Sequence, residues 1–236
     1  MPNSRELKAL LRPLLKRRPD LAHHKRAVFF APLTHYLRGV VFAQGWSSGD
    51  FTAEVFATPL FDGEHSLNAG SRFDKERRRF SETWRANPDT ASAELCDYLE
   101  RQALPIVDPV INPFEHEKLP QYIAGYTRGI PLIASPLNRF IMSVGACFVG
   151  EFDKAQHLLA ALDGTGLLPS GPATEQFRND QDLFHRVAYL SELLRTDRSQ
   201  VIPLLHEWEA AKVRHLDLGK FWKPTPFPCE SKIAKS

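Results

Sequence analysis

The side chains with the clearest capacity for acid–base or metal chemistry are Asp62, Glu64 and His65, together with His35. The first three follow the third expected strand, and loops at strand ends often carry functional side chains. A histidine and two carboxylates can transfer protons or bind a divalent ion if the fold brings them together. A hairpin turn built on Asp62 and Gly63 explains the same residues and is the preferred interpretation. We therefore expect no metal and no cofactor, and a hydrolase or metal-dependent enzyme is the alternative function.

Basic residues gather in three segments that could contact phosphate groups. The segments are Lys16 to Arg18, His23 to Arg26, and Lys75 with Arg77, Arg78 and Arg79. If the first helix folds back on the sheet, these side chains form one surface for polyanions. The aromatic side chains on which single-stranded bases stack are scarce there, with only Phe73 and Phe80 adjacent. A solvated basic face is the preferred interpretation, and nucleic-acid binding through Arg77, Arg78 and Arg79 is a second alternative.

The usual nucleotide and nucleophile motifs are absent from the sequence, which contains no GxGxxG, GxxxxGK[ST] or GxSxG. Its cysteines, Cys96, Cys147 and Cys229, are far apart and lack CxxC or Cys/His ligand spacing. This usage indicates free thiols in a reducing compartment, so we expect a cytoplasmic protein. Cys147 lies among apolar neighbours, and we expect an inert core thiol.

The composition is that of a globular protein, with 43% hydrophobic and 25% charged residues in a chain of 236. A chain of this size buries roughly 70 to 75% of its unfolded surface and needs no disulfide or metal to fold. Thirty basic and 28 acidic residues leave a formal charge of +2, so no global field drives nonspecific binding to nucleic acid. No stretch approaches the ~18 uninterrupted apolar residues of a transmembrane helix, and we expect no membrane partner.

Hydrophobic spacing predicts helices around an N-terminal sheet. A leucine stripe predicts a first helix, capped by Ser4 and kinked or shortened by Pro13: Leu7, Leu10, Leu11, Leu14 and Leu15. Strands are expected at residues 27–31, 36–46, 51–60 and 66–73. Helices are expected at residues 89–103, 136–148, 152–162, 174–194 and 198–216, followed by an extended tail that is either docked or frayed.

These elements predict an α+β fold. A small antiparallel β-sheet in the N-terminal half packs with helices, and a mostly α-helical C-terminal half follows. We expect one domain over residues 1–236 that shares a core. Its subregions are the helix and sheet at 1–85, the helical part at 86–220 and the proline-rich tail at 221–236.

The hairpin over residues 36–60 is the most strongly specified local structure. With Ser48 and Gly49 at the turn centre, the core face carries four cross-strand pairs: Trp46 with Phe51, Gln44 with Ala53, Phe42 with Val55 and Val40 with Ala57. The opposite face then carries Val41, Glu54 and Phe56. We expect the leucine stripe of the first helix to cover that opposite face. In the alternative, the face is open and its three side chains bind a partner.

Several segments together resemble a family of uncharacterised bacterial proteins known only as a domain of unknown function. They are LKALLRPLL, LRGVVF, FTAEVFATPLF, GEFDKAQHLL, LLHEWE and FWKPTPFP. The resemblance implies a bacterial source and an α+β fold, and it implies no activity, cofactor or functional residue. Some small families of this type are partners in toxin–immunity systems, which by analogy favours a binding function.

We therefore expect a cytoplasmic bacterial protein that binds another macromolecule. The expected partner is a protein, in a regulatory or toxin–immunity role. The candidate binding residues come from the second sheet face and from the strand ends: Val41, Glu54, Phe56, His35, Asp62, Glu64 and His65.

Overall fold

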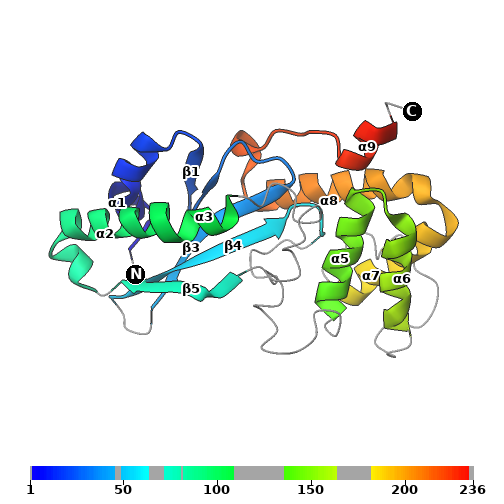
Figure 1. Cartoon of the computed structure of the whole chain (residues 1–236), viewed down its shortest axis with the longest axis horizontal. Helices are drawn as coiled ribbons and strands as arrows, with labels where there is room; N and C mark the ends of the chain where they lie inside the picture. The colour runs from blue at the N-terminus through cyan, green and yellow to red at the C-terminus, as the bar shows by residue number, and fades with distance from the viewer. Residues whose placement is uncertain are drawn as a thin grey trace. The chain divides into compact units, whose positions relative to one another are not determined.

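The computed structural model describes residues 2–45, 49–63, 72–80, 82–108, 136–163 and 182–233. Its fold is α+β, as the sequence predicts, with an antiparallel sheet in the N-terminal half and helices predominating in the C-terminal half (Figure 1). The chain divides into two compact units, Met1–Thr58 with Ser71–Asn112 and Pro59–Gly70 with Pro113–Ser236. We describe each unit by itself. A single core shared over residues 1–236 stays a prediction.

The first unit contains the sheet. In chain order its elements are α1 (Ser4–Arg17), β1 (Leu21–His24), β2 (Ala27–Phe30), β3 (Tyr36–Gln44), β4 (Phe51–Pro59), β5 (Arg72–Phe80), a 3₁₀ turn (Glu82–Arg85), α2 (Pro88–Tyr98), a π-helical segment (Leu99–Ala103) and α3 (Leu104–Val107). The strand order is β1-β2-β3-β4-β5, so each strand pairs with its neighbours in the chain. Two differences from the sequence prediction stand out, because β1 was not expected and β5 lies later than residues 66–73.

The first helix begins with a cap one residue earlier than predicted. The Asn3 side chain, not that of Ser4, accepts hydrogen bonds from two backbone N–H groups of the first turn. Glu6 completes a capping box by accepting from the Asn3 N–H at 2.7 Å. Pro13 does not cut the helix short, and α1 continues to Arg17.

One face of the sheet is the core of the first unit. The buried leucines of α1 belong to one hydrophobic cluster with residues from the strands and from α2: Val40, Phe42, Phe51, Ala53, Val55 and Leu95. Helices α1 and α2 lie side by side (Figure 1). The predicted core face of the hairpin is therefore confirmed at these strand positions, and Ala57 packs against the cluster, whereas Gln44 is exposed and Trp46 lies outside the described residues.

The register of the hairpin differs from the prediction by two residues at the end next to the loop. The Gly45 N–H donates to the Asp50 carbonyl at 3.1 Å, which places these two residues opposite each other. The predicted register, which pairs Gln44 with Ala53, would place Gly45 opposite Thr52. Because the shift is an even number of residues, each side chain keeps the face that the sequence predicts for it.

The second face of the sheet is buried at the positions tested, but the leucine stripe does not cover it. Phe56 is 2% exposed and Glu54 is 5% exposed, while Val41 is half-buried. Glu54 accepts a hydrogen bond from the Thr52 hydroxyl at 3.1 Å. The prediction was wrong because the core face, with Phe42 and its apolar neighbours, offers the leucines more apolar surface than this polar-bearing face does.

The second unit is helical in the part that the structure describes. Its elements are α5 (Pro136–Phe148), α6 (Phe152–Asp163), α7 (Leu183–Thr196), a 3₁₀ turn (Arg198–Gln200), α8 (Val201–His215), a 3₁₀ turn (Gly219–Phe221) and α9 (Pro228–Ile233). The predicted helical hairpin of α5 and α6 is confirmed. Gly150 closes it with φ at +85°, a conformation that favours glycine. Helices α7 and α8 match the second predicted pair, although residues 174–181 lie outside the described residues.

The tail is docked, which is one of the two predicted alternatives, and it ends in the short helix α9, which the sequence did not predict. The Phe227 ring stacks on the His206 ring of α8 with centroids 3.9 Å apart. Glu230 accepts a hydrogen bond from the Phe227 N–H at 2.7 Å, and its carboxylate lies 2.8 Å from His206 Nε2. Glu209 and Glu230 together raise the pKa of His206. These contacts fix the start of α9 on α8.

Truncation of either buried phenylalanine tests the two sheet faces. We expect Phe42→Ala and Phe56→Ala each to lower the free energy of unfolding by about 3 to 5 kcal/mol, because each leaves a cavity. Val41→Ala, at a half-buried position on the same face as Phe56, is the matched control and should cost less than about 1.5 kcal/mol. Chemical denaturation measures all three. A cost below about 1 kcal/mol for Phe56→Ala would mean that the second face is open to solvent.

Candidate functional site

The residues singled out for acid–base or metal chemistry are divided between the two units. His35 is buried in the first unit, and Asp62 is buried in the second. Glu64 and His65 lie outside the described residues. Over the described ranges, no group of three or more His, Cys, Asp or Glu side chains is arranged to hold a metal ion.

Asp62 belongs to a buried polar network in the second unit. Lys212 Nζ of α8 lies 2.8 Å from the Asp62 carboxylate and also donates to the Pro59 carbonyl at 2.9 Å. Arg186 of α7 donates to the Asp62 carbonyl at 2.9 Å. Gly63 has φ at +70°, and a Cβ there would lie 2.9 Å from Arg186 Cδ. The network therefore holds the bend at Asp62 and Gly63 against α7 and α8, while the rest of the predicted hairpin turn lies outside the described residues.

Removal of the Lys212 charge tests the structural role of this network. The Lys212 side chain is 0% exposed and that of Asp62 is 3% exposed, so Lys212→Met leaves a buried carboxylate without its cation. We expect a loss of about 3 to 5 kcal/mol in the free energy of unfolding. The double variant Asp62→Asn with Lys212→Met should recover part of that loss, measured by chemical denaturation. A single variant as stable as the wild type would rule out a structural ion pair.

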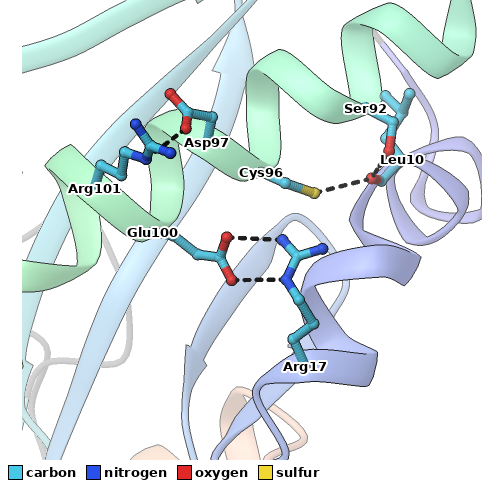
Figure 2. Close-up of polar contacts among 7 residues, drawn as sticks. All are labelled: Leu10, Arg17, Ser92, Cys96, Asp97, Glu100 and Arg101. Carbon is cyan, nitrogen blue, oxygen red and sulfur yellow. Dashed lines mark hydrogen bonds and ion pairs between the residues drawn. The ribbon is translucent and has the colours of Figure 1, made fainter.

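The basic segments are partly neutralised by carboxylates within the first unit. Arg17 forms a two-bond ion pair with Glu100, with Nη2 to Oε2 at 2.7 Å (Figure 2). Arg18 pairs with Asp20 at 2.7 Å. These pairs leave the end of α1 with less free positive charge than its sequence suggests, which weakens a phosphate-binding surface there.

A groove of about 370 Å³ lies between α1 and α2, on the side where Arg17 meets Glu100. We call it the acidic groove, because three of its four charged lining residues are carboxylates. Its lining residues are Pro13, Arg17, Asp89, Ser92, Ala93, Cys96, Asp97 and Glu100. At its floor Ser92 Oγ donates to the Leu10 carbonyl at 2.7 Å, and Cys96 Sγ lies 3.7 Å from the same oxygen (Figure 2). Burial raises the pKa of the Cys96 thiol. Burial and the raised pKa both disfavour the thiolate, as is typical of a cysteine that packs in a core.

A second pocket, of about 320 Å³, lies between β5 and α2. It is lined by Arg78, Arg79, Phe80, Trp84, Asn87, Thr90, Ala91 and Glu94. We call it the arginine–aromatic pocket. It contains two of the three arginines that the sequence singled out. The side chain of the third, Arg77, lies outside the part that the structure describes.

Aromatic rings of the core form the floor of the arginine–aromatic pocket. The rings of Phe80 and Phe51 stack with centroids 4.9 Å apart. Trp84 meets Phe51 edge-on at 6.2 Å, and its indole N–H donates to the Gly49 carbonyl at 3.0 Å. Edge-on and offset contacts of this kind are the favoured arrangements of aromatic pairs. The floor is thus held in place by packing and by a hydrogen bond.

The two arginines of the pocket differ in their electrostatic state. Arg79 forms an ion pair with the buried carboxylate of Asp50, with Nε to Oδ2 at 2.6 Å. The Arg78 guanidinium lies 5.3 Å from the Phe80 ring centroid and 5.5 Å from that of Tyr98. Across the described part of the chain, Arg78 makes these cation–π contacts and no hydrogen bond or ion pair. Its N–H donors are therefore available to a ligand.

Sequence reasoning found the arginines but missed their aromatic partners. The sequence prediction includes Phe73 and Phe80 as aromatic neighbours of the arginines. It does not include Trp84 or α2, because it places the strand at residues 66–73. The segment Arg77 to Trp84 combines arginines, phenylalanine and tryptophan within eight residues. That interleaving is the signal that could have indicated the pocket.

Comparisons with protein-family models, with curated proteins and with solved structures found no match. Among the residues that the structure places, no helix is long and apolar enough to cross a membrane.

Proposed function

We propose that the protein is a protein-binding module whose partner docks on α2. The supporting observation is that α2 separates two hollows of different charge, the acidic groove on one side and the arginine–aromatic pocket on the other. Between them lies an exposed strip of α2, which we call the α2 surface: Asp89, Thr90, Ala93, Glu94 and Asp97. A partner with acidic and basic groups in complementary positions can be held there in a single orientation.

The charge pattern of the α2 surface favours a protein partner over a nucleic acid. Asp89 and Glu94 are exposed on this strip and repel a phosphate backbone, while the exposed Asp97 forms an ion pair with Arg101 at 2.7 Å. Ala93 lies at the middle of the strip, where a small side chain lets a partner approach the helix closely. Interfaces that combine both signs of charge around a tightly packed centre are typical of protein–protein recognition. A regulatory or toxin–immunity role is the form of this function that the family resemblance suggests.

Site-specific crosslinking tests the proposal. A photoreactive phenylalanine analogue is placed at Ala93, with Ala160 as the matched control, because Ala160 is an exposed alanine on α6. We expect a discrete protein adduct from Ala93 in extracts of the source organism and none from Ala160. Mass spectrometry identifies the captured protein, which is then purified for calorimetry.

Calorimetry with the purified partner decides the outcome. We expect Ala93→Trp to weaken its binding at least about tenfold by blocking the α2 surface, and Ala160→Trp to leave the affinity unchanged. Unchanged binding by Ala93→Trp, equal adducts at both positions, or capture of nucleic acid alone would each contradict the proposal. Melting temperatures of both variants show that they fold.

A further inference from the structure

The arginine–aromatic pocket combines a free cation with an apolar floor. The rings of Phe80 and Tyr98 attract the positive charge of Arg78 but offer no lone pair to its N–H groups. These contacts therefore leave the N–H donors unused. Planar guanidinium groups bind carboxylates through two parallel N–H···O bonds. The buried rings below exclude water, which strengthens an ion pair formed above them.

From these contacts we propose that the pocket binds a carboxylate side chain from an acidic segment of the partner protein, with Arg78 as its donor. This inference rests on the proposed function and names the partner group that the α2 surface recognises. The pocket's volume of about 320 Å³ is at the lower end of the range for ligand sites, roughly 300 to 1,000 Å³. It suits one or two acidic side chains rather than a whole nucleotide.

The charges that line the pocket select a carboxylate over a phosphate. Asp50 already neutralises Arg79, and Glu94 adds a negative charge to the wall. One cation, Arg78, therefore remains for the ligand within the described lining. A single guanidinium matches a monoanion. Glu94 repels both anions, and it repels a phosphate with more than one negative charge more strongly than a carboxylate.

The rim of the pocket offers polar groups to a peptide backbone. Asn87 precedes α2, and its side chain does not cap the helix. Asn87 and Thr90 are both exposed at the pocket. Their side chains can donate to and accept from the backbone amides of an extended segment, as amides and hydroxyls do. Arg78 would bind the carboxylate, and the polar groups of the rim would orient the backbone of the partner's peptide segment.

Nuclear magnetic resonance with a defined probe tests the inference. The probe is the peptide acetyl-Glu-Asp-Glu-Asp-amide, and its neutral match is acetyl-Gln-Asn-Gln-Asn-amide. We expect saturable shifts of the Arg78 side-chain Nε–H signal and of the backbone amides of residues 87 and 89–94 with the acidic peptide alone. Arg78→Gln should weaken binding at least about tenfold, and Arg78→Lys should fall between, because lysine keeps the charge but loses the two-bond geometry.

Arg195→Gln provides the control, because Arg195 is an exposed arginine of α7 in the second unit. It should bind the acidic peptide with wild-type affinity. Equal affinity for the neutral peptide, or unchanged binding by Arg78→Gln, would overturn the assignment. Tighter binding of inorganic phosphate or of a 20-nucleotide single strand than of the peptide would also overturn it, in favour of a phosphate site.

The two proposals fail in different ways. If the purified partner binds in an Ala93-dependent manner while Arg78→Gln binds it normally, the pocket assignment is wrong and the docking on α2 stands. If the acidic peptide binds through Arg78 while Ala93 captures no protein, the pocket binds carboxylates and the α2 surface is not a protein-docking site.

Discussion

The contact between the rings of Phe51 and Phe80 is the interaction on which the candidate site depends. Phe80 is the buried side chain among those described in β5, so its ring attaches the end of this mostly charged strand to the core. An aromatic pair of this kind contributes about 0.5 to 1.5 kcal/mol beyond the apolar area that it buries. Strand β5 lies at the end of the sheet order and pairs with β4. Its position therefore follows from one cross-strand ladder and this ring contact.

The same contact decides where the charged residues lie. Phe51 pairs with Phe80, and Ala53 pairs with Arg78 on the same face, so Arg78 emerges beside the core rings and next to α2. Arg79 pairs with Thr52 and so starts from the opposite face of the strand, and its guanidinium bonds to Asp50 while the side chain also lines the pocket. A strand places alternate side chains on opposite faces, which separates two neighbouring arginines into one paired and one available cation. The free charge at the pocket is thus a consequence of strand geometry.

The local parts of the fold could be predicted from the sequence. Alternation assigned Phe42 and Phe51 to the core face, and the stripe on α1 identified the leucines that pack there. The prediction placed that stripe on the wrong face of the sheet. Helical spacing shows which residues of a helix are buried, but it does not show which surface buries them. The predicted position of β5 was too early in the chain, because the charged residues of this strand hide the alternation of apolar and polar residues that marks a strand. Its pairing with β4 fixes its position.

The candidate site was harder to predict, because its residues come from three elements that only the fold brings together. Arg78 lies on β5, Trp84 on a 3₁₀ turn and Glu94 on α2. Asp62 was recognised as the start of a turn, but Arg186 and Lys212 lie more than 100 residues further along the chain. Such distant partners leave no trace in local sequence patterns.

The central claim is that Arg78, which has no hydrogen bond or ion pair within the described residues, lies against aromatic rings and binds a carboxylate. A crystal structure of the protein with the acidic tetrapeptide tests it most directly. We predict a peptide carboxylate with both oxygens about 2.7 to 2.9 Å from the Arg78 nitrogens, while Arg79 stays paired with Asp50. A peptide bound away from Arg78, or an Arg78 guanidinium that the protein's own carboxylates already neutralise, would contradict the claim.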